Sequence, residues 1–177
     1  TKIGMGWPER VDIIKWINRI LSWEPNARIV LHGVSMGAAT VLMASGEDLP
    51  GNVKAVIADC GYTSEWDEFQ READTLHIPW FPVLNATSVL SKIRDGYDFK
   101  QASALAQVKK SRIPTLFIHG SSDELVPYSM LGELYAAAAC EKEELTVEGA
   151  GHALSSSVAP TLYWRTVEDF IAKYLDR

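Results

Sequence analysis

Short apolar runs alternate with amphipathic stretches along this chain, and the alternation predicts its elements. Apolar runs bounded by turn residues are typical of strands that are buried in a sheet. The expected strands are residues 29–34, 53–58, 113–119 and 144–148. Apolar residues at intervals of three and four predict helices, which are residues 8–23, 36–46, 126–139 and 160–175. Strands that alternate with helices predict an α/β fold, with a mostly parallel sheet covered by helices on both faces.

One segment breaks this alternation. Residues 63–112 separate the second and third expected strands, and they are too many for a plain crossover. We expect a helical cap or lid there, inserted in a single domain that spans residues 1–177, although ordinary crossover helices would give the same pattern. The aromatic residues Trp66, Trp80 and Phe81 of this segment are candidate substrate-binding residues for an apolar acyl or aryl group.

The most informative stretch is Gly33-Val34-Ser35-Met36-Gly37, between the first expected strand and a helix. A chain that reverses direction so tightly is strained, and we expect small residues at Gly33 and Gly37 to relieve the crowding. Such a turn exposes the Ser35 hydroxyl to a base, and the helix that follows directs backbone N–H groups toward an anion. The alternative is a Gly/Ser turn with an idle serine.

Three further polar residues follow strands at the same edge of the predicted sheet. The carboxyl ends of parallel strands meet at one edge, where open α/β sheets bind their ligands. Asp59, Asp123 and His152 come after the second, third and fourth expected strands. A serine needs a base to take its proton, and the glycine-flanked loop of His152 lets it reach Ser35. A carboxylate must orient that base. The loop before Asp123 favours this residue, and Asp59 is the alternative acid.

The remaining histidines and cysteines have simpler interpretations. We expect structural hydrogen bonds from His32 and His119, which end strands, and a solvated or packed position for His77 in the insertion. Cys60 has no histidine beside it in the sequence, which favours a buried structural thiol. No spacing of His, Asp and Glu resembles a metal site, so we expect neither a metal nor a cofactor.

Composition and charge exclude several classes of partner. The net charge of −6 argues against nonspecific nucleic-acid binding and against polybasic attachment to a membrane. No stretch approaches the ~18 apolar residues of a membrane span, and no signal peptide is visible. Two cysteines make no disulfide framework, which favours the cytoplasm. The chain begins at Thr1, and an anchor or signal upstream of it stays open.

Three motifs together resemble the serine α/β-hydrolase superfamily. They are Gly33-Val34-Ser35-Met36-Gly37, Ile118-His119-Gly120-Ser121-Ser122-Asp123-Glu124-Leu125-Val126-Pro127 and Gly149-Ala150-Gly151-His152. Their order of Ser, Asp and His is that of the superfamily. The resemblance implies that Ser35 attacks a carbonyl, that His152 carries the proton and that Asp123 orients His152. It also implies that the backbone N–H of Met36 supplies half of an oxyanion hole.

The chain also resembles one branch of the superfamily, and it matches only part of the superfamily's fold. The stretch Asp59-Cys60-Gly61-Tyr62, at the end of the second expected strand, resembles the corresponding stretch of a bacterial branch that has esterase-like and peptidase-like members. The superfamily has more strands than are expected here, so the chain resembles its C-terminal portion. The first strands and the second oxyanion N–H would then lie outside the chain. Residues 29–34 would form an exposed edge through which the chain can self-associate.

These features predict a hydrolase that acts on a carboxylic ester or related acyl bond of a small molecule, through an acyl-enzyme intermediate. A serine peptidase or a thioesterase can use the same three residues. A non-catalytic, incomplete hydrolase that only binds acyl ligands is a further alternative from a different class.

Overall fold

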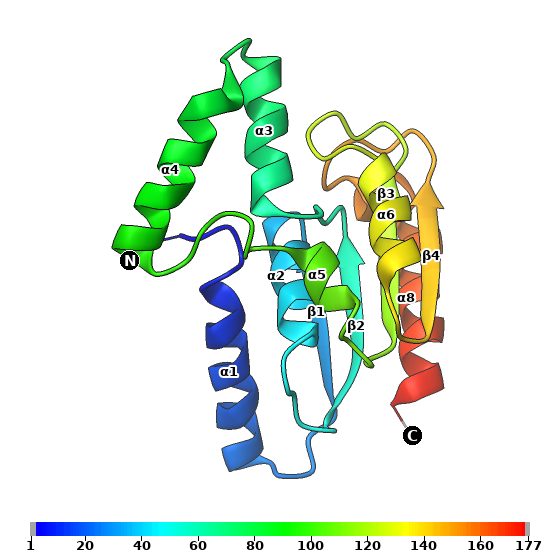
Figure 1. The fold of residues 1–177 in the computed structure, drawn as a ribbon. Coiled ribbons are helices and arrows are strands. Elements are labelled where there is room, and N and C mark those ends of the chain that lie inside the picture. The colour runs from blue at the N-terminus through cyan, green and yellow to red at the C-terminus, as the bar shows by residue number, and fades with distance from the viewer. Residues whose placement is uncertain (1–2, 176–177) are drawn as a thin grey trace.

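A parallel sheet between two layers of helices forms the body of the protein (Figure 1). The computed structural model describes residues 3–175. Its four strands lie side by side in chain order, and each pairs in parallel with the next. They are β1 (Ile29–Val34), β2 (Val53–Asp59), β3 (Thr115–Gly120) and β4 (Lys142–Val147). The predicted α/β fold is confirmed, and β1 lies at one edge of the described sheet.

Helices cover both faces of this sheet. The helices on one face are α1 (Glu9–Trp23), α2 (Met36–Ser45), α5 (Ala104–Val108) and α6 (Ser129–Ala137). The other face is covered by α8 (Pro160–Tyr174), which follows the short α7 (Ser155–Val158). Successive residues of a strand point to opposite faces. In β2, Val56 accordingly packs into the first layer, while Ile57 packs against the α8 layer that includes Phe170.

The insertion between β2 and β3 divides into two parts. Helices α3 (Glu65–Thr75) and α4 (Trp80–Asp95) rise beyond the carboxyl ends of the strands, whereas α5 lies in the helical layer beside α2 (Figure 1). The Ser64 side chain accepts a hydrogen bond from the Asp67 N–H at 3.0 Å, which caps the start of α3. Ser64 also pairs with Ser103 in an antiparallel bridge, which closes the base of the projecting part.

Several element boundaries differ from the sequence prediction by one to three residues, and two of these differences have a clear cause. Helix α6 begins at Ser129, not at residue 126, because Asp123 Oδ1 accepts the N–H groups of Leu125 and Val126 at 2.9 Å each and holds them in a turn. Strand β4 begins at Lys142, because its pairing with β3 extends back to Thr115. Within the described residues, no helix is both long enough and apolar enough to cross a membrane.

Candidate active site

Ser35 stands at a strained turn between β1 and α2. Its backbone has φ 56° and ψ −120°, and its N–H donates to the Asp59 carbonyl oxygen at 2.8 Å. A Cβ at Gly33 would lie 2.2 Å from the Gly37 carbonyl oxygen, so only glycine fits at Gly33. At Gly37 a Cβ would meet nothing within 4 Å among the described residues. The expectation that both glycines relieve crowding is therefore correct at Gly33 and wrong at Gly37.

Three side chains from different loops meet at the carboxyl edge of the sheet. His152 Nε2 lies 2.7 Å from Ser35 Oγ, and His152 Nδ1 lies 2.9 Å from Asp123 Oδ2. Since an ionised carboxylate only accepts hydrogen bonds, Nδ1 carries the proton and Nε2 is free to accept the hydroxyl proton. Asp123 is buried, whereas the His152 side chain is partly open to the surface. The structure therefore brings together the three residues that the sequence predicts as nucleophile, base and orienting acid.

Asp123 is held by more than its contact with His152. Its Oδ1 accepts the backbone N–H groups of Leu125 and Val126, and its Oδ2 lies 3.3 Å from Nε2 of the fully buried His119. His119 Nε2 also lies 3.0 Å from the Val126 carbonyl oxygen. Structural hydrogen bonding by His119 was predicted, but its contact with Asp123 was not.

The loop that carries Asp123 and the loop that carries His152 are joined. Ser122 donates its N–H to the Ala150 carbonyl oxygen at 3.0 Å, and Gly149 donates its N–H to Ser121 Oγ at 2.9 Å. A Cβ at Gly120 would lie only 2.2 Å from the Ala150 carbonyl oxygen. The two loops thus pack as one unit, which fixes the carboxylate relative to the imidazole.

Asp59, the alternative acid, faces a different set of partners. Its Oδ1 accepts from Ser155 Oγ at 3.1 Å, and the Tyr163 hydroxyl also bonds to its carboxylate. These partners are side chains of α7 and α8, not the nearby backbone amides that a turn residue would be expected to bind. Burial raises the pKa of Asp59, and these hydrogen bonds oppose the rise. Tyr163 also lies 3.0 Å from His32 Nε2, which confirms the expected structural hydrogen bond of His32.

Cys60 lies beside Asp123 and His152. Its Sγ and single donor atoms of Asp123 and His152 lie within 4.8 Å of one another. Burial, with the Asp59 charge, raises the pKa of the Cys60 thiol to about 12, so the thiol keeps its proton. Because metal ligands must be deprotonated and His152 Nδ1 is already bonded to Asp123, these three residues are a poor metal site. Cys60 behaves as the buried structural thiol that was expected.

The Ser35 hydroxyl opens into a small cavity of about 230 Å³, hereafter the Ser35 cavity. It is lined by Met5, Met36, Tyr62 and Val126, by Leu125, and by Glu68, Phe69 and Glu72 of α3. As the first residue of α2, Met36 presents a backbone N–H that has no acceptor within the helix. It is the N–H that the sequence predicts as one donor of an oxyanion hole.

A charged pair from α3 lies at this cavity. The Glu68 side chain is only 11% exposed and its Oε2 lies 3.6 Å from Arg71 Nη2. Glu68 Oε1 is buried without a hydrogen-bond partner among the described residues. Burial raises the pKa of Glu68, and the Arg71 charge opposes this rise. Glu68 could not be predicted as a residue of the site, because one acidic residue on an amphipathic helix gives no signal of its own.

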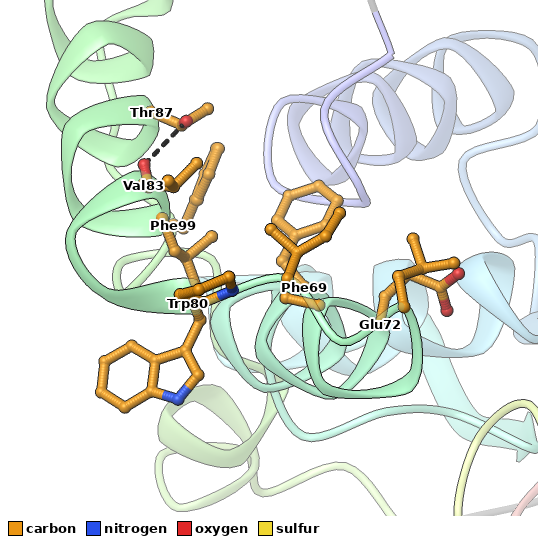
Figure 2. Close-up of a pocket in the computed structure, with 11 residues that line it drawn as sticks. Phe69, Glu72, Trp80, Val83, Thr87 and Phe99 are labelled. Atoms are coloured by element: carbon orange, nitrogen blue, oxygen red, sulfur yellow. Dashed lines mark hydrogen bonds between the residues drawn. The ribbon is translucent and has the colours of Figure 1, made fainter.

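The three aromatic residues predicted to bind substrate lie in different places. None of them is among the residues that line the Ser35 cavity. Trp80 lines a neighbouring cavity between α3 and α4 (Figure 2). Phe81 is 67% exposed. Trp66 donates its Nε1–H to Gln70 Oε1 at 3.1 Å, and the Lys100 ammonium lies over its ring.

Comparison with known proteins agrees with this architecture. Residues 8–177 match the model of the prolyl oligopeptidase family. This chain belongs to that family. It is 32% identical over 171 residues to the YqkD protein of Bacillus subtilis, covering 94% of this chain and 55% of that protein. It is 30% identical over 182 residues to the α/β-hydrolase domain-containing protein WAV2 of Arabidopsis thaliana, covering 96% of this chain and 56% of that protein. The chain thus spans about half the length of the curated relatives it matches.

Solved structures of an acylaminoacyl peptidase and an esterase have the same fold. An acylaminoacyl peptidase of Pyrococcus horikoshii superposes with a TM-score of 0.74 at 19% identity, over 98% of this chain and 29% of that one. An esterase of Pyrococcus furiosus superposes with a TM-score of 0.72 at 18% identity, over 99% of this chain and 65% of that one. The family member described here is therefore a serine α/β hydrolase by fold, and it matches the C-terminal portion of that fold.

Proposed function

We propose that this chain carries the catalytic machinery of a serine hydrolase that cleaves a carboxylic ester or related acyl bond of a small molecule. The observation that carries the proposal is the continuous contact from Ser35 Oγ through the His152 ring to Asp123, at 2.7 and 2.9 Å. Nucleophile and base within hydrogen-bond reach, with the base held by a third group, are the signature of covalent acyl transfer.

The roles of the side chains follow from this geometry. Ser35 Oγ attacks the carbonyl carbon while His152 Nε2 takes the hydroxyl proton, and Asp123 stabilises the imidazolium that forms. The Met36 N–H donates to the negative oxygen of the tetrahedral intermediate. His152 then gives its proton to the leaving alcohol, which leaves an acyl group on Ser35. A water molecule, deprotonated by His152, releases the acid in the reverse sequence of steps.

Peptide or thioester hydrolysis is the second candidate. All three reactions pass through an acyl-enzyme, so the catalytic residues alone do not separate them. Membership of the prolyl oligopeptidase family and the likeness to an acylaminoacyl peptidase favour a peptide bond. The likeness to the Pyrococcus furiosus esterase favours an ester.

The test uses the complete protein that contains these residues. A fluorophosphonate probe is expected to label Ser35, and p-nitrophenyl acetate is expected to be hydrolysed. Ser35→Ala should abolish the label and lower turnover by several orders of magnitude, with unchanged circular dichroism. Ester, thioester and anilide substrates that carry the same acyl group then show which type of bond the protein cleaves. If the wild-type protein binds acyl ligands but is neither labelled nor active, it is a non-catalytic binding protein instead.

A further inference from the structure

A second cavity lies beside the Ser35 cavity, between α3 and α4 (Figure 2). Its volume is about 270 Å³, near the lower end of the ~300–1,000 Å³ that is typical of small-molecule sites. Its walls are mainly apolar and include Ala73, Leu76, Val83 and Phe99. Phe99 is buried, and its N–H donates to Ser88 Oγ of α4 at 3.1 Å, so this wall is fixed in place. We call this space the α3–α4 cavity.

Two residues line both cavities. Phe69 and Glu72 belong to the wall of the Ser35 cavity and also to the wall of the α3–α4 cavity. They are three positions apart on α3 and therefore lie on the same face of the helix. The Phe69 ring lies 4.9 Å from the Phe99 ring between centroids, at the side nearer α4. The two cavities therefore adjoin at Phe69 and Glu72, and a molecule held at Ser35 would have to pass these side chains to reach the second cavity.

The chemistry of the α3–α4 cavity favours an alkyl chain over a peptide. Thr87 is one of its few polar residues, and its hydroxyl already donates to the Val83 carbonyl oxygen at 2.9 Å. Glu72 is exposed, and its carboxylate points away from the α4 side of the cavity (Figure 2). A peptide would bring backbone N–H and C=O groups that find few partners here, and burying them unpaired is costly. An alkyl chain gains from burial and needs no partner.

We infer that the α3–α4 cavity binds the alkyl chain of an acyl group whose carbonyl carbon is attacked by Ser35. The inference rests on the proposed function and names its substrate class: acyl esters or thioesters with an unbranched chain long enough to pass Phe69. Specificity for chain length would then lie in the insertion, while the bond-breaking residues lie on the sheet.

The first test is a series of p-nitrophenyl esters from acetate to decanoate, with the complete protein and with fluorophosphonate labelling of Ser35 measured in parallel. Burial of each added methylene should raise kcat/KM by about fourfold until the cavity is full. Beyond that length, kcat/KM should level off or fall.

The second test fills the cavity. Ala73→Trp places an indole inside it and should lower the ratio of octanoate to acetate kcat/KM by about tenfold or more. Ala86→Trp is the matched control, because Ala86 is an exposed residue of α4 outside the cavity lining. It should leave this ratio unchanged.

The outcomes separate this inference from the function on which it rests. The inference is overturned if the protein hydrolyses the acetate ester but kcat/KM does not change with chain length. It is also overturned if the ratio of octanoate to acetate kcat/KM is equal in both tryptophan variants. Either result leaves the hydrolase assignment standing. If Ala73→Trp lowers the melting temperature without changing the ratio, the cavity is a packing site and the inference is again overturned. A protein that is neither labelled nor active on any ester overturns both.

Discussion

His119 Nε2 lies 3.3 Å from Asp123 Oδ2, whereas the backbone donors of Leu125 and Val126 bond to the other carboxylate oxygen, Oδ1. Its other neighbour, the Val126 carbonyl oxygen at 3.0 Å, can only accept a hydrogen bond. The proton of the His119 ring therefore resides on Nε2, where it is donated to the Val126 carbonyl oxygen and lies close to Asp123 Oδ2. Since His119 is fully buried, water cannot replace it. We therefore expect His119 to help position the Asp123 carboxylate beside His152.

His119→Phe should lower kcat by about tenfold, equivalent to ~1.4 kcal/mol, with little change in KM. The aromatic ring keeps most of the volume but removes the polar N–H that lies beside Asp123. His119→Gln, whose amide can still donate, should recover part of the loss. Equal kcat values for wild type and His119→Phe, at equal melting temperature, would show that the contact is only structural.

The two aspartates at the strand ends should respond very differently to loss of charge. Asp123→Asn should lower turnover by about 10⁴, because the neutral amide favours the wrong tautomer of His152. Asp59→Asn should lower it by less than about tenfold, because Asp59 bonds to Ser155 and Tyr163 and not to His152. Rates with a short activated ester measure both effects. The reverse order of these losses would make Asp59 the acid.

Glu65 should make stability depend on pH. Burial, with a smaller contribution from Glu9, raises the pKa of Glu65 from its ordinary value of 4.5 to about 8. Between these values the folded protein binds more protons than the unfolded chain, so the Glu65 contribution to stability is present below pH 4.5 and is lost as pH rises toward 8. The slope is at most about 1.4 kcal/mol per pH unit.

Glu65→Gln should remove this pH dependence, because glutamine cannot ionise yet can still accept the hydrogen bond from Tyr97. Urea unfolding of both proteins between pH 4.5 and 8 measures this pH dependence. As pH rises, the free energy of unfolding of the variant should increase relative to that of wild type. Glu133→Gln, on the exposed side of α6, is the control and should show no such gain. Parallel pH curves for wild type and Glu65→Gln would refute the prediction.

The two glycines of the serine turn should differ in their tolerance of a methyl group. Gly33→Ala should destabilise the fold by ~2 kcal/mol or more, since the new Cβ would meet the Gly37 carbonyl oxygen. Gly37→Ala should be neutral or stabilising by ~0.5–1 kcal/mol, because this position is helical and open. Denaturant unfolding gives both values. A destabilised Gly37→Ala variant would mean that other parts of the complete protein pack there.

Much of the site was predictable because it depends on the ends of strands. A parallel sheet brings its carboxyl ends to one edge, so the order of Ser35, Asp123 and His152 along the chain was enough to expect them together. The choice between Asp123 and Asp59 was harder, since both follow strands. Only the packing of α7 and α8 shows that the Asp59 side chain is already bonded on that side.

The surroundings of the site were not predictable in the same way. Glu68 and Phe69 reach the Ser35 cavity because α3 projects over the sheet edge at a particular angle, and helical spacing does not encode that angle. Trp66 was expected to bind substrate because it is aromatic, yet its indole bonds to Gln70 along the same helix. Apolar periodicity identifies a helix face but does not identify what that face contacts.

The contact of Gly120 with the Ala150 carbonyl has a practical consequence for redesigning this scaffold. Because the loops after β3 and β4 pack together there, random changes in either loop would damage both the carboxylate and the imidazole positions at once. A library for altered substrate preference should therefore keep those loops constant and place its diversity on α3 and α4. Helix α3 contributes side chains to both cavities and α4 to the α3–α4 cavity, but neither contributes to the Ser35, His152 and Asp123 contacts. Substrate preference can then be varied through α3 and α4 while the contacts of Ser35, His152 and Asp123 stay unchanged.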